Sequence, residues 1–474
     1  MAAKNIVVVG AGLGGLTAAA LLARAGHRVT VLEGNDWIGG KSRRIEVAGQ
    51  RIDTGPSLVT FPGVLDELFD RYDDLGAAGA AGSARDIAGL RLERLPEVGR
   101  YFFRGTAANL PVEPGHEWHD AWTRFEAQHG GLGPAITRLL TADPFDAGIL
   151  PAVTALTSRY GIRLSAQSFI NGLRWMPEDL REVIAIHTLN AGISPARTLA
   201  LYASMPAVMA RDGIFVPTGG VYEIPLALAR LATEAGATIV TGAPVTRIAR
   251  GTVSTAARDY PADVVVGATD AQVLNRLLGR RAPAARRASC SGIAVFTALS
   301  DPLPDHVVTH SVIMPDSPRD LHRSLDRREL PEQTMAFLNY YKPGHIYPND
   351  KATAAVLLTA PADGQRYTID HPFVQAEMAR ISRVMELDGS IADRIVGHTI
   401  LDPQYFSAFG ADAGSLYGAT RHLWQGGPFH TPLYNSPLTP WLWRVGASVH
   451  PGGGIPAVLG GAMTSVKRLL DSLR

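Results

Sequence analysis

Residues 6–26 read IVVVGAGLGGLTAAALLARAG, and this stretch decides the fold of the chain. The four apolar residues 6–9 predict a buried strand, and residues 16–25 predict a helix that Gly26 ends. The glycines between them have the G-x-G-x-x-G spacing of a dinucleotide-binding turn. A second strand is predicted at residues 29–32, and Glu33 follows it directly. Strand, glycine turn, helix, strand and acid in this order predict a Rossmann-type nucleotide unit.

The glycines of this turn have distinct physical tasks. Gly10 permits the tight turn, Gly12 lets the backbone approach a pyrophosphate, and Gly15 lets the helix pack against the strand. The start of the helix offers free N–H groups and a positive dipole end to phosphates. Glu33 can accept hydrogen bonds from a ribose diol. The residues of this unit predicted to contact the nucleotide are Gly10, Gly12, Leu13, Gly14, Gly15, Glu33 and Gly34.

Further glycine motifs narrow the choice between NAD and FAD. Residues 39–41 read Gly-Gly-Lys, and residues 53–57 read Asp-Thr-Gly-Pro-Ser. Residues 446–456 read Gly-Ala-Ser-Val-His-Pro-Gly-Gly-Gly-Ile-Pro, between a predicted strand at 443–447 and an amphipathic helix at 457–473. This second strand, loop and helix also turns a helix N-terminus towards a polar or anionic group.

In their order and spacing, these motifs resemble the amine-oxidase-like FAD superfamily and, within it, the bacterial phytoene desaturase family of carotenoid desaturases. The resemblance covers nearly the whole chain and is weakest at 71–169 and 301–395. It implies that the Gly-Gly pair lies against the FAD pyrophosphate, that the Gly-Pro segment and the C-terminal block lie near the flavin, and that Val245 meets the adenine. Amine oxidases usually place an acid where Ala447 and Ser448 stand, which favours the desaturase branch. The further FAD contacts implied are Gly39, Gly40, Lys41, Gly55, Pro56, Ser57, Val245, Gly446, Ala447, Pro451, Gly452, Gly453, Gly454 and Ile455.

The predicted fold class is α/β. We expect a Rossmann-type FAD-binding domain built from discontinuous segments, with an α+β substrate domain and an apolar helical region. Residues 1–95, 215–300 and 396–474 are assigned to the FAD-binding domain. Residues 96–214 and 301–395 are assigned to a substrate-binding and membrane-associating region.

Composition excludes several classes of function. The formal net charge of +1 over 474 residues gives no electrostatic case for a nucleic-acid partner. The single cysteine, Cys290, excludes an internal disulfide, a CxxC redox pair and a C-terminal cysteine-linked flavin, so the FAD is expected to be non-covalent. The histidines show no clustered ligand spacing, and no metal site is predicted.

The apolar stretches of the sequence indicate where in the cell we expect the protein to lie. No unbroken apolar span reaches about 20 residues, the length that a membrane helix needs. Residues 183–210 carry Arg197 as their only formal charge, and residues 147–158 are also apolar. Both stretches suit a substrate tunnel, a membrane surface or ordinary core helices. We expect a cytoplasmic protein that is peripheral on the inner face of the cell membrane.

The resemblance implies a reaction at a CH–CH bond. A carotenoid desaturase removes a hydride, which the flavin takes, and a proton from the neighbouring carbon. His450 is the candidate proton acceptor, because its loop is expected near the flavin and imidazole titrates near neutrality. The competing interpretation is that His450 holds the loop by a backbone hydrogen bond. Oxygen or a quinone is the expected final electron acceptor.

The choice of substrate stays open between two carotenoids. The C-terminal block favours phytoene, whereas residues 356–364 and the short chain look more like enzymes that desaturate a 1-hydroxycarotenoid at the 3,4 bond, which we expect here. A redox-neutral carotenoid isomerase is an alternative on the same scaffold. A non-catalytic prenyl- or lipid-binding protein of the dissociation-inhibitor type is another, against which the intact phosphate turn argues. A soluble amine oxidase would need an aromatic cage for its amine.

Overall fold

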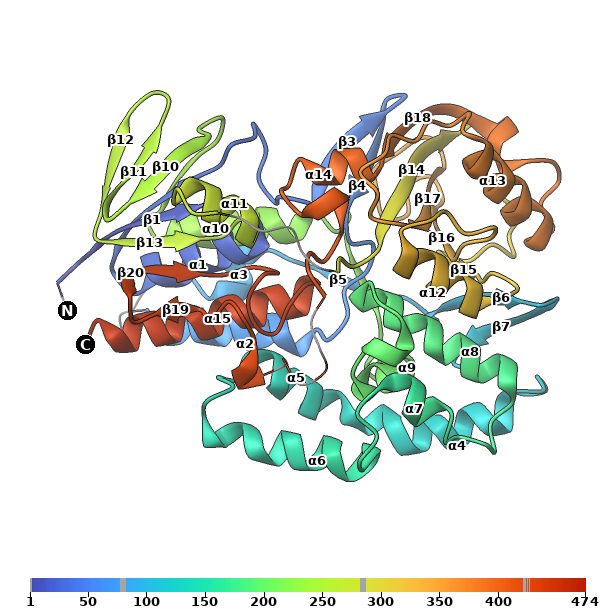
Figure 1. Cartoon of the computed structure of the whole chain (residues 1–474). Helices are drawn as coiled ribbons and strands as arrows, with labels where there is room; N and C mark the ends of the chain where they lie inside the picture. Colours follow the sequence, from blue (N-terminus) through green and yellow to red (C-terminus); the bar gives the residue numbers. More distant parts are fainter. Residues whose placement is uncertain (1, 77–81, 282–286, 421–422, 424, 426) are drawn as a thin grey trace.

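The computed structural model describes residues 2–76, 82–281, 287–420, 423, 425 and 427–474 (Figure 1). Figure 1 shows two sheets side by side above a layer of helices, with both chain ends on the side of the first sheet. Within the described residues the first sheet has the strand order β19-β20-β13-β1-β2-β9. Its strands are β1 (Asn5–Val9), β2 (Arg28–Leu32), β9 (Thr238–Val240), β13 (Val264–Gly267), β19 (Asn435–Ser436) and β20 (Thr439–Arg444).

The centre of the first sheet is parallel and buried on both faces. β1 pairs in parallel with β2 on one side and with β13 on the other. Ile6 and Val8 pack towards the helices, while Val7 and Val9 pack towards the opposite layer. This double burial explains the unbroken apolar run of β1.

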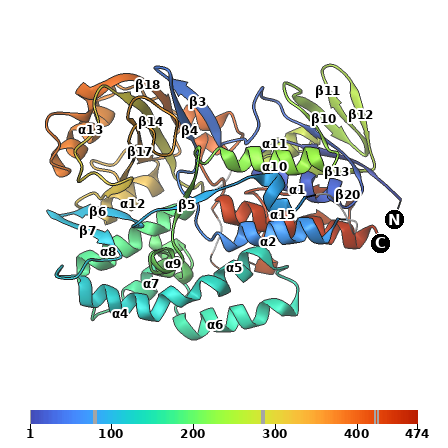
Figure 2. The ribbon, with the colours of Figure 1, turned by 180° about the vertical axis from the view of Figure 1, so that it is seen from behind.

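Helices cover one face of the first sheet and a small antiparallel sheet covers the other. Figure 2 shows the helices stacked between the sheet and the lower helical layer. They are α1 (Leu13–Arg24), α2 (Gly63–Asp74), α3 (Ala84–Ala88), α10 (Glu223–Glu234) and α15 (Ile455–Ser472). The opposite face carries β10 (Val245–Ala249), β11 (Gly251–Thr255), β12 (Asp259–Ala262) and α11 (Ala271–Leu277).

The predicted strand at 443–447 is wrong by several residues, because β20 ends at Arg444. The chain turns there for a physical reason. Val445 N donates to Gly267 O, and Gly446 then takes a φ of +96°, which no regular strand contains. The predicted helices at 16–25 and 457–473 are confirmed with earlier starts, at Leu13 and Ile455.

The second sheet has the order β18-β14-β17-β16-β15-β6-β7 among the described residues. Its strands are β6 (Gly99–Phe103), β7 (Thr106–Leu110), β14 (Ser291–Leu299), β15 (His310–Ile313), β16 (Ala336–Tyr341), β17 (Thr353–Ala360) and β18 (Ile395–Leu401). β14 lies inside the range 215–300 that we assigned to the FAD-binding domain, yet it pairs with β17 and β18. Helix α13 (Pro372–Val384) covers one face, and α12 (Pro318–Arg327) follows β15.

Short elements link the sheets. The hairpin of β3 (Arg43–Val47) and β4 (Gln50–Thr54) packs on the second sheet through Val47 and Ile52. Strands β5 (Leu92–Arg94) and β8 (Phe215–Pro217) pair with each other, and α14 (Pro403–Ser407) follows β18.

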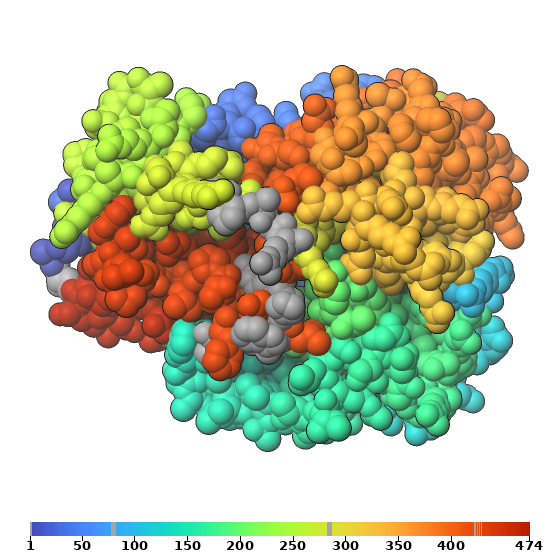
Figure 3. Space-filling model, viewed as in Figure 1, coloured from blue at the N-terminus to red at the C-terminus, as the bar shows by residue number. Residues whose placement is uncertain are grey.

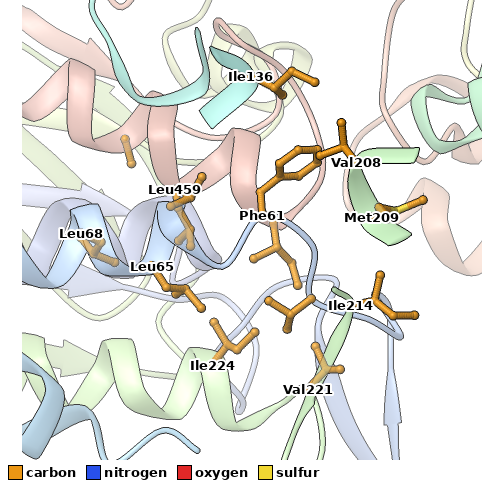
Figure 4. Packing of buried hydrophobic residues seen from close by; sticks show 14 of the residues in the cluster. Phe61, Leu65, Leu68, Ile136, Val208, Met209, Ile214, Val221, Ile224 and Leu459 are labelled. Carbon is orange, nitrogen blue, oxygen red and sulfur yellow. The ribbon is translucent and has the colours of Figure 1, made fainter. Parts of the chain in front are cut away.

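The lower layer is helical. It comprises α4 (His119–His129), α5 (Gly133–Thr141), α6 (Leu150–Tyr160), α7 (Ala166–Ile170), α8 (Glu178–Ile186) and α9 (Met205–Asp212). Figure 4 shows how it joins the cofactor layer: Phe61, from the loop before α2, points towards Val208 of α9, with Leu459 of α15 close by. One hydrophobic core therefore ties the helical layer to the first sheet.

The two apolar stretches, residues 183–210 and 147–158, differ in how far their side chains are buried. Within residues 183–210, side chains such as Val183, Ile184 and Ala207 are fully buried, so this stretch belongs to the core. Residues 147–158 instead form most of α6, which exposes Leu150 and Val153. Among the described residues, none of the helices combines the length and the apolar character needed to cross a membrane.

Candidate active site

The glycine turn after β1 has the geometry expected of a phosphate-binding turn. Gly10 adopts a φ of +105°, and its N–H donates to Leu32 O at 2.8 Å. A Cβ on Gly15 would lie 2.0 Å from Gly10 O, so only glycine lets α1 approach the turn this closely. Gly12 is the N-cap of α1 and brings no side-chain cap, which leaves the first N–H groups of the helix available to an anion.

Segments far apart in sequence close around this turn. Gly39 N donates to Ala11 O at 2.7 Å, and a Cβ on Gly40 would lie 3.3 Å from the Gly12 Cα. A Cβ on Gly14 would lie 3.0 Å from the backbone N of Gly446. We call this assembly the cradle; it comprises Gly10, Ala11, Gly12, Leu13, Gly14, Gly15, Gly39, Gly40, Lys41, Gly55 and Gly446.

Gly55 joins the cradle through Lys41. Gly55 has a φ of +92°, and a Cβ there would lie 2.5 Å from Lys41 O. The Lys41 ammonium is buried and donates to Leu416 O at 2.6 Å. Burial lowers the pKa of Lys41, although the nearby Asp270 carboxylate opposes that shift. The positive charge thus lies beside the cradle, where a phosphate would stabilise it.

Glu33 holds the far end of the cradle. It is 6% exposed, and its Oε2 accepts from Ala11 N at 2.7 Å. Its Oε1 accepts from the backbone N and the side-chain Nδ2 of Asn35, at 2.9 and 2.8 Å. A carboxylate has about four acceptor sites, so Glu33 retains capacity for a ribose hydroxyl.

Gly34 and Val245 lie beside Glu33. Gly34 packs against Pro244, whose atoms a Cβ would meet at 3.7 Å, and Val245 begins β10 directly after it. Ala243 N donates to Glu33 O at 2.8 Å, which ties the two segments together. These contacts bring Gly34 and Val245, the predicted adenine contact, close to Glu33.

Sequence reasoning missed the polar group under the C-terminal loop. Asp270 caps α11 by accepting from Gln272 N at 2.8 Å, and burial raises its pKa. Ser448 Oγ accepts from Ala271 N at 3.0 Å, so this serine ties the loop to α11. The only signal for Asp270 was its position directly before a predicted helix, which suits an N-cap.

The loop of residues 446–454 runs from the cradle to the start of α15. Its ordered turn includes Gly452 and Gly454 at positive φ, and Ile455 begins the helix. Gly453 lies against Tyr417, because a Cβ there would be 2.6 Å from that ring. Ala447 and Pro451 lie on the same loop and are partly buried.

His450 is held by its backbone. Its carbonyl accepts from Tyr434 Oη at 3.0 Å, whereas its ring Nε2 is buried and has no hydrogen-bond partner among the described residues. Burial lowers the pKa of His450 to about 4, against the opposing effect of Asp143. The ring is therefore neutral at pH 7, but it is a weaker base than the near-neutral imidazole that the sequence prediction assumed.

A small cavity of about 20 Å³ separates the loop at Gly55 from the second sheet. Its acid, Asp53, accepts from Arg44 at 2.7 Å and from Tyr222 N at 2.8 Å. His450 is not part of its lining, so the structure does not bring this residue and the cavity together. The lining residues are Ile52, Asp53, Gly55, Pro56, Ser57, Val221, Phe296, Asn339, Tyr341, Tyr347, Thr353, Ala354, Ala355 and Leu357.

The sheet side of this cavity was not predicted. Asn339 is a polar residue in the otherwise apolar and aromatic strand AFLNYY, and that contrast was the available signal. The loop side consists of Gly55, Pro56 and Ser57, which the resemblance implies as FAD contacts.

The residues present fit FAD. A Cβ on Gly12 would meet no atom within 4 Å, so open space remains beside the uncapped start of α1. The cradle includes a buried ammonium at Lys41, and a buried carboxylate at Glu33 contacts it through Ala11 N. This donor set matches a dinucleotide, with cationic and N–H groups for phosphates and an acid for a ribose.

Comparisons with known proteins agree with this geometry. The family model described as "Flavin containing amine oxidoreductase" matches residues 13–367. A phytoene dehydrogenase from Streptomyces griseus is 29% identical, over 98% of this chain and 95% of the relative. A hydroxyneurosporene desaturase from Cereibacter sphaeroides is 28% identical, over 98% of each chain.

Solved structures show the same fold. Putrescine oxidase bound to putrescine superposes with a TM-score of 0.64 at 15% identity, covering 100% of this chain and 99% of that one. Cyclohexylamine oxidase from Brevibacterium oxydans superposes with a TM-score of 0.62 at 15% identity, covering 100% of both. With the family model covering most of its length, the chain belongs to the flavin-containing amine oxidoreductase family, and it is an FAD-dependent oxidoreductase.

Proposed function

We propose that the enzyme introduces a C=C bond into a carotenoid, and that its substrate is a 1-hydroxycarotenoid oxidised at the 3,4 bond. The observation that carries this proposal is the similarity to carotenoid desaturases over 98% of the chain, among them a hydroxyneurosporene desaturase. The charges beside Gly55 agree with an uncharged substrate, because Asp53 is the one carboxylate among the described residues lining the small cavity there and Arg44 neutralises it. A site without an available anion suits an uncharged substrate better than an ammonium group.

Bound FAD supplies a two-electron acceptor for a hydride from carbon. The residues of the chain bind the FAD, orient a C–H bond of the substrate and exclude water. The sheet face over Gly55 excludes water with buried aromatic and aliphatic side chains, among them Phe296, Tyr341 and Ala355.

We propose His450 as the proton acceptor. Its ring is neutral at pH 7, because burial lowers its pKa to about 4, and Nε2 has no partner among the described residues. Since His450 lies outside the present cavity lining, this role requires that the polyene extend along the loop of residues 446–454. Oxygen or a quinone is the proposed final electron acceptor.

An anaerobic assay tests the proposed reaction. FAD-loaded protein is mixed with liposomes that carry either a 1-hydroxycarotenoid or phytoene, while the flavin and polyene absorbances are followed. We expect flavin bleaching and a red-shifted polyene with the hydroxylated substrate. Bleaching with phytoene alone would identify a phytoene desaturase. A changed polyene geometry with pre-reduced flavin and no net bleaching would identify an isomerase, and no change with either would favour a lipid-binding protein.

We further propose that the enzyme works at the cytoplasmic surface of the cell membrane. Helix α6 and the segments at its two ends expose large apolar side chains, and Figure 3 shows this layer as the lower edge of the molecule. The segment just before Tyr434 exposes two more large apolar side chains, Phe429 and Leu433. This segment lies near the helical layer, because Tyr434 interacts electrostatically with Asp143. Such a patch suits contact with a bilayer that holds an apolar substrate. The exposed residues are Phe145, Leu150, Val153, Ile162, Leu164, Phe429 and Leu433.

The double variant Leu150→Ser/Val153→Ser is expected to bind liposomes at least about tenfold more weakly, because burying each apolar side chain contributes about 1.5–3 kcal/mol. Co-sedimentation with vesicles of anionic and zwitterionic lipid measures this. Val396→Ser is the matched control, because Val396 is 47% exposed on β18 at the opposite edge of the molecule (Figure 1). Equal loss in both variants would contradict the assignment of this surface.

A further inference from the structure

A second cavity lies apart from the candidate active site and has a volume of about 550 Å³. Small-molecule sites in proteins have volumes of roughly 300–1,000 Å³. This cavity is bounded by α7, α8, α12 and the short helix η4 (Pro195–Arg197), and α12 lies above α8 and α7 in Figure 1. We call it the α8 pocket; its charged lining residues are Glu178, Arg181, Glu182, Arg319, Arg323 and Asp326.

Two arginines of the α8 pocket have no partner for their guanidinium groups among the described residues. Arg181 Nε is buried and forms no hydrogen bond there. Arg319 is exposed at the pocket and takes part in none of the ion pairs between described residues. Guanidinium groups bind phosphate oxygens through paired, charge-assisted hydrogen bonds. The two arginines therefore offer a place for a phosphate group.

Two carboxylates share the pocket with these arginines. Glu178 and Glu182 are four residues apart on α8, so their side chains lie on the same face of the helix. Burial raises the pKa of Glu182, while the charges of Arg104, Arg319 and Arg181 oppose that shift. A simple anion would be repelled by these acids. The charges of the pocket therefore suit a ligand that carries an ammonium group as well as a phosphate.

The other titratable groups of the pocket do not change this balance. Burial lowers the pKa of His322 to about 4, so its ring is neutral at pH 7, and its buried Nδ1 has no partner among the described residues. Asp326 pairs with Arg197 at 2.5 Å, and Arg323 pairs with Asp320 at 2.9 Å.

An apolar segment lies beside the pocket. Ile162 is 98% exposed and Leu164 is 64% exposed, on the chain that leads into α7. Arg163, between them, lies against Gly172, where a Cβ would be 2.8 Å from its guanidinium carbon. Asn171, the residue before Gly172, lines the pocket. The charged pocket is thus next to part of the apolar surface that we assign to the membrane.

We propose that the α8 pocket binds the headgroup of a membrane lipid that carries a phosphodiester and a primary ammonium group. Arg181 and Arg319 donate to the phosphate oxygens. Glu178 and Glu182 accept from the ammonium group, and the acyl chains leave past residues 162–164. The inference rests on the membrane contact proposed above and adds a lipid preference to it.

Isothermal titration calorimetry without a bilayer tests the pocket itself. FAD-loaded protein is titrated with dihexanoyl-phosphatidylethanolamine, and separately with dihexanoyl-phosphatidylcholine, whose quaternary ammonium has no N–H to donate. Both lipids are kept below their critical micelle concentrations. The Kd of the ethanolamine lipid is expected to be at least about tenfold lower. Glu178→Gln should reduce this preference, and Arg319→Gln should weaken the binding of both lipids by about tenfold.

Arg159→Gln is the matched control, because Arg159 is exposed on α6 and its loss removes the same charge outside the pocket. This variant should bind both lipids like the wild type. Glu178 and Arg319 are exposed as well, so their substitution does not endanger the fold. Equal affinities of the wild type for the two lipids, or unchanged affinities in Arg319→Gln, would overturn the inference.

Glycerophosphoethanolamine, which has the same headgroup without acyl chains, separates a lipid from a soluble ligand. It is expected to bind about tenfold more weakly than the short-chain lipid, because it cannot bury apolar surface against residues 162–164. Equal affinity would overturn the lipid assignment and give the pocket to a soluble compound with a phosphate and an ammonium group.

The calorimetry also separates this inference from the proposals above. Leu150→Ser/Val153→Ser should keep the wild-type affinity for the short-chain lipid, because neither residue lines the pocket. Headgroup binding without flavin bleaching would leave the pocket standing and remove the desaturase proposal. Bleaching by carotenoid-loaded liposomes without any headgroup binding would do the reverse.

Discussion

Gly12→Val is expected to give a folded protein that no longer retains FAD. Gly12 has φ −68° and ψ 172°, an extended conformation that valine adopts readily. A Cβ there would meet no protein atom within 4 Å, so the first carbon of the new side chain has room. The side chain would instead fill the space beside the start of α1, where the pyrophosphate is expected. The dissociation constant for FAD should rise at least about 100-fold, or ~2.7 kcal/mol.

The ratio of flavin to protein absorbance and a titration with FAD measure this loss. Circular dichroism and the thermal midpoint report folding, where the weaker N-cap costs roughly 1 kcal/mol. Gly131→Val is the matched control, because Gly131 is exposed in the helical layer and its φ is not positive. Full FAD occupancy in Gly12→Val would contradict the position that we assign to the pyrophosphate.

Lowering the pH from 7.5 to 5.5 is expected to reduce the free energy of unfolding by roughly 7 kcal/mol. Burial lowers the pKa of five histidines: that of His187 to about 3, and those of His129, His310, His322 and His450 to about 4. The unfolded chain binds protons near the ordinary value of 6.5, while the folded chain does not. Stability from these groups is therefore present above pH 6.5 and is lost as the pH falls towards 4. At pH 5.5 each contributes about 1.4 kcal/mol of the loss.

Urea unfolding at the two pH values, with saturating FAD and constant salt, measures this effect. His129→Phe removes one titrating group with little change in packing, since the ring stacks on Phe125 at 4.6 Å. Its hydrogen-bond partner Ser204 keeps Tyr160, whose Oη lies 2.6 Å away. This variant should lose about 1.4 kcal/mol less on acidification. Equal unfolding midpoints for the wild type at pH 7.5 and 5.5 would show that the buried histidines do not control acid stability.

Local sequence patterns predicted the nucleotide unit well, because its requirements are local. A tight turn and a close helix approach demand glycine at Gly10 and Gly15, whatever surrounds them. The predicted strand at 443–447 shows where local sequence patterns are not enough to predict the structure. Residues 445–447 are apolar enough for a strand, but the pairing of β20 with β13 ends at Arg444 and the chain turns at Gly446.

The apolar stretches show the same limit. Residues 183–210 and 147–158 have similar composition, yet the first lies in the core and the second exposes its side chains on α6. Burial depends on what the other segments place against a helix, and composition does not contain that information.

By itself, the sequence determined the FAD-binding unit, because glycine spacing and strand–turn–helix order act over a few residues. It also determined the family, through motifs spread along the chain. Only the tertiary structure decided which distant residues share a site. Asn339, Thr353 and Gly55 meet at one cavity because the register of β16 with β17 sets their common face and the packing of the second sheet brings it to the cradle. Register and packing are set by contacts across hundreds of residues, so the substrate side of the site could not be read from local patterns.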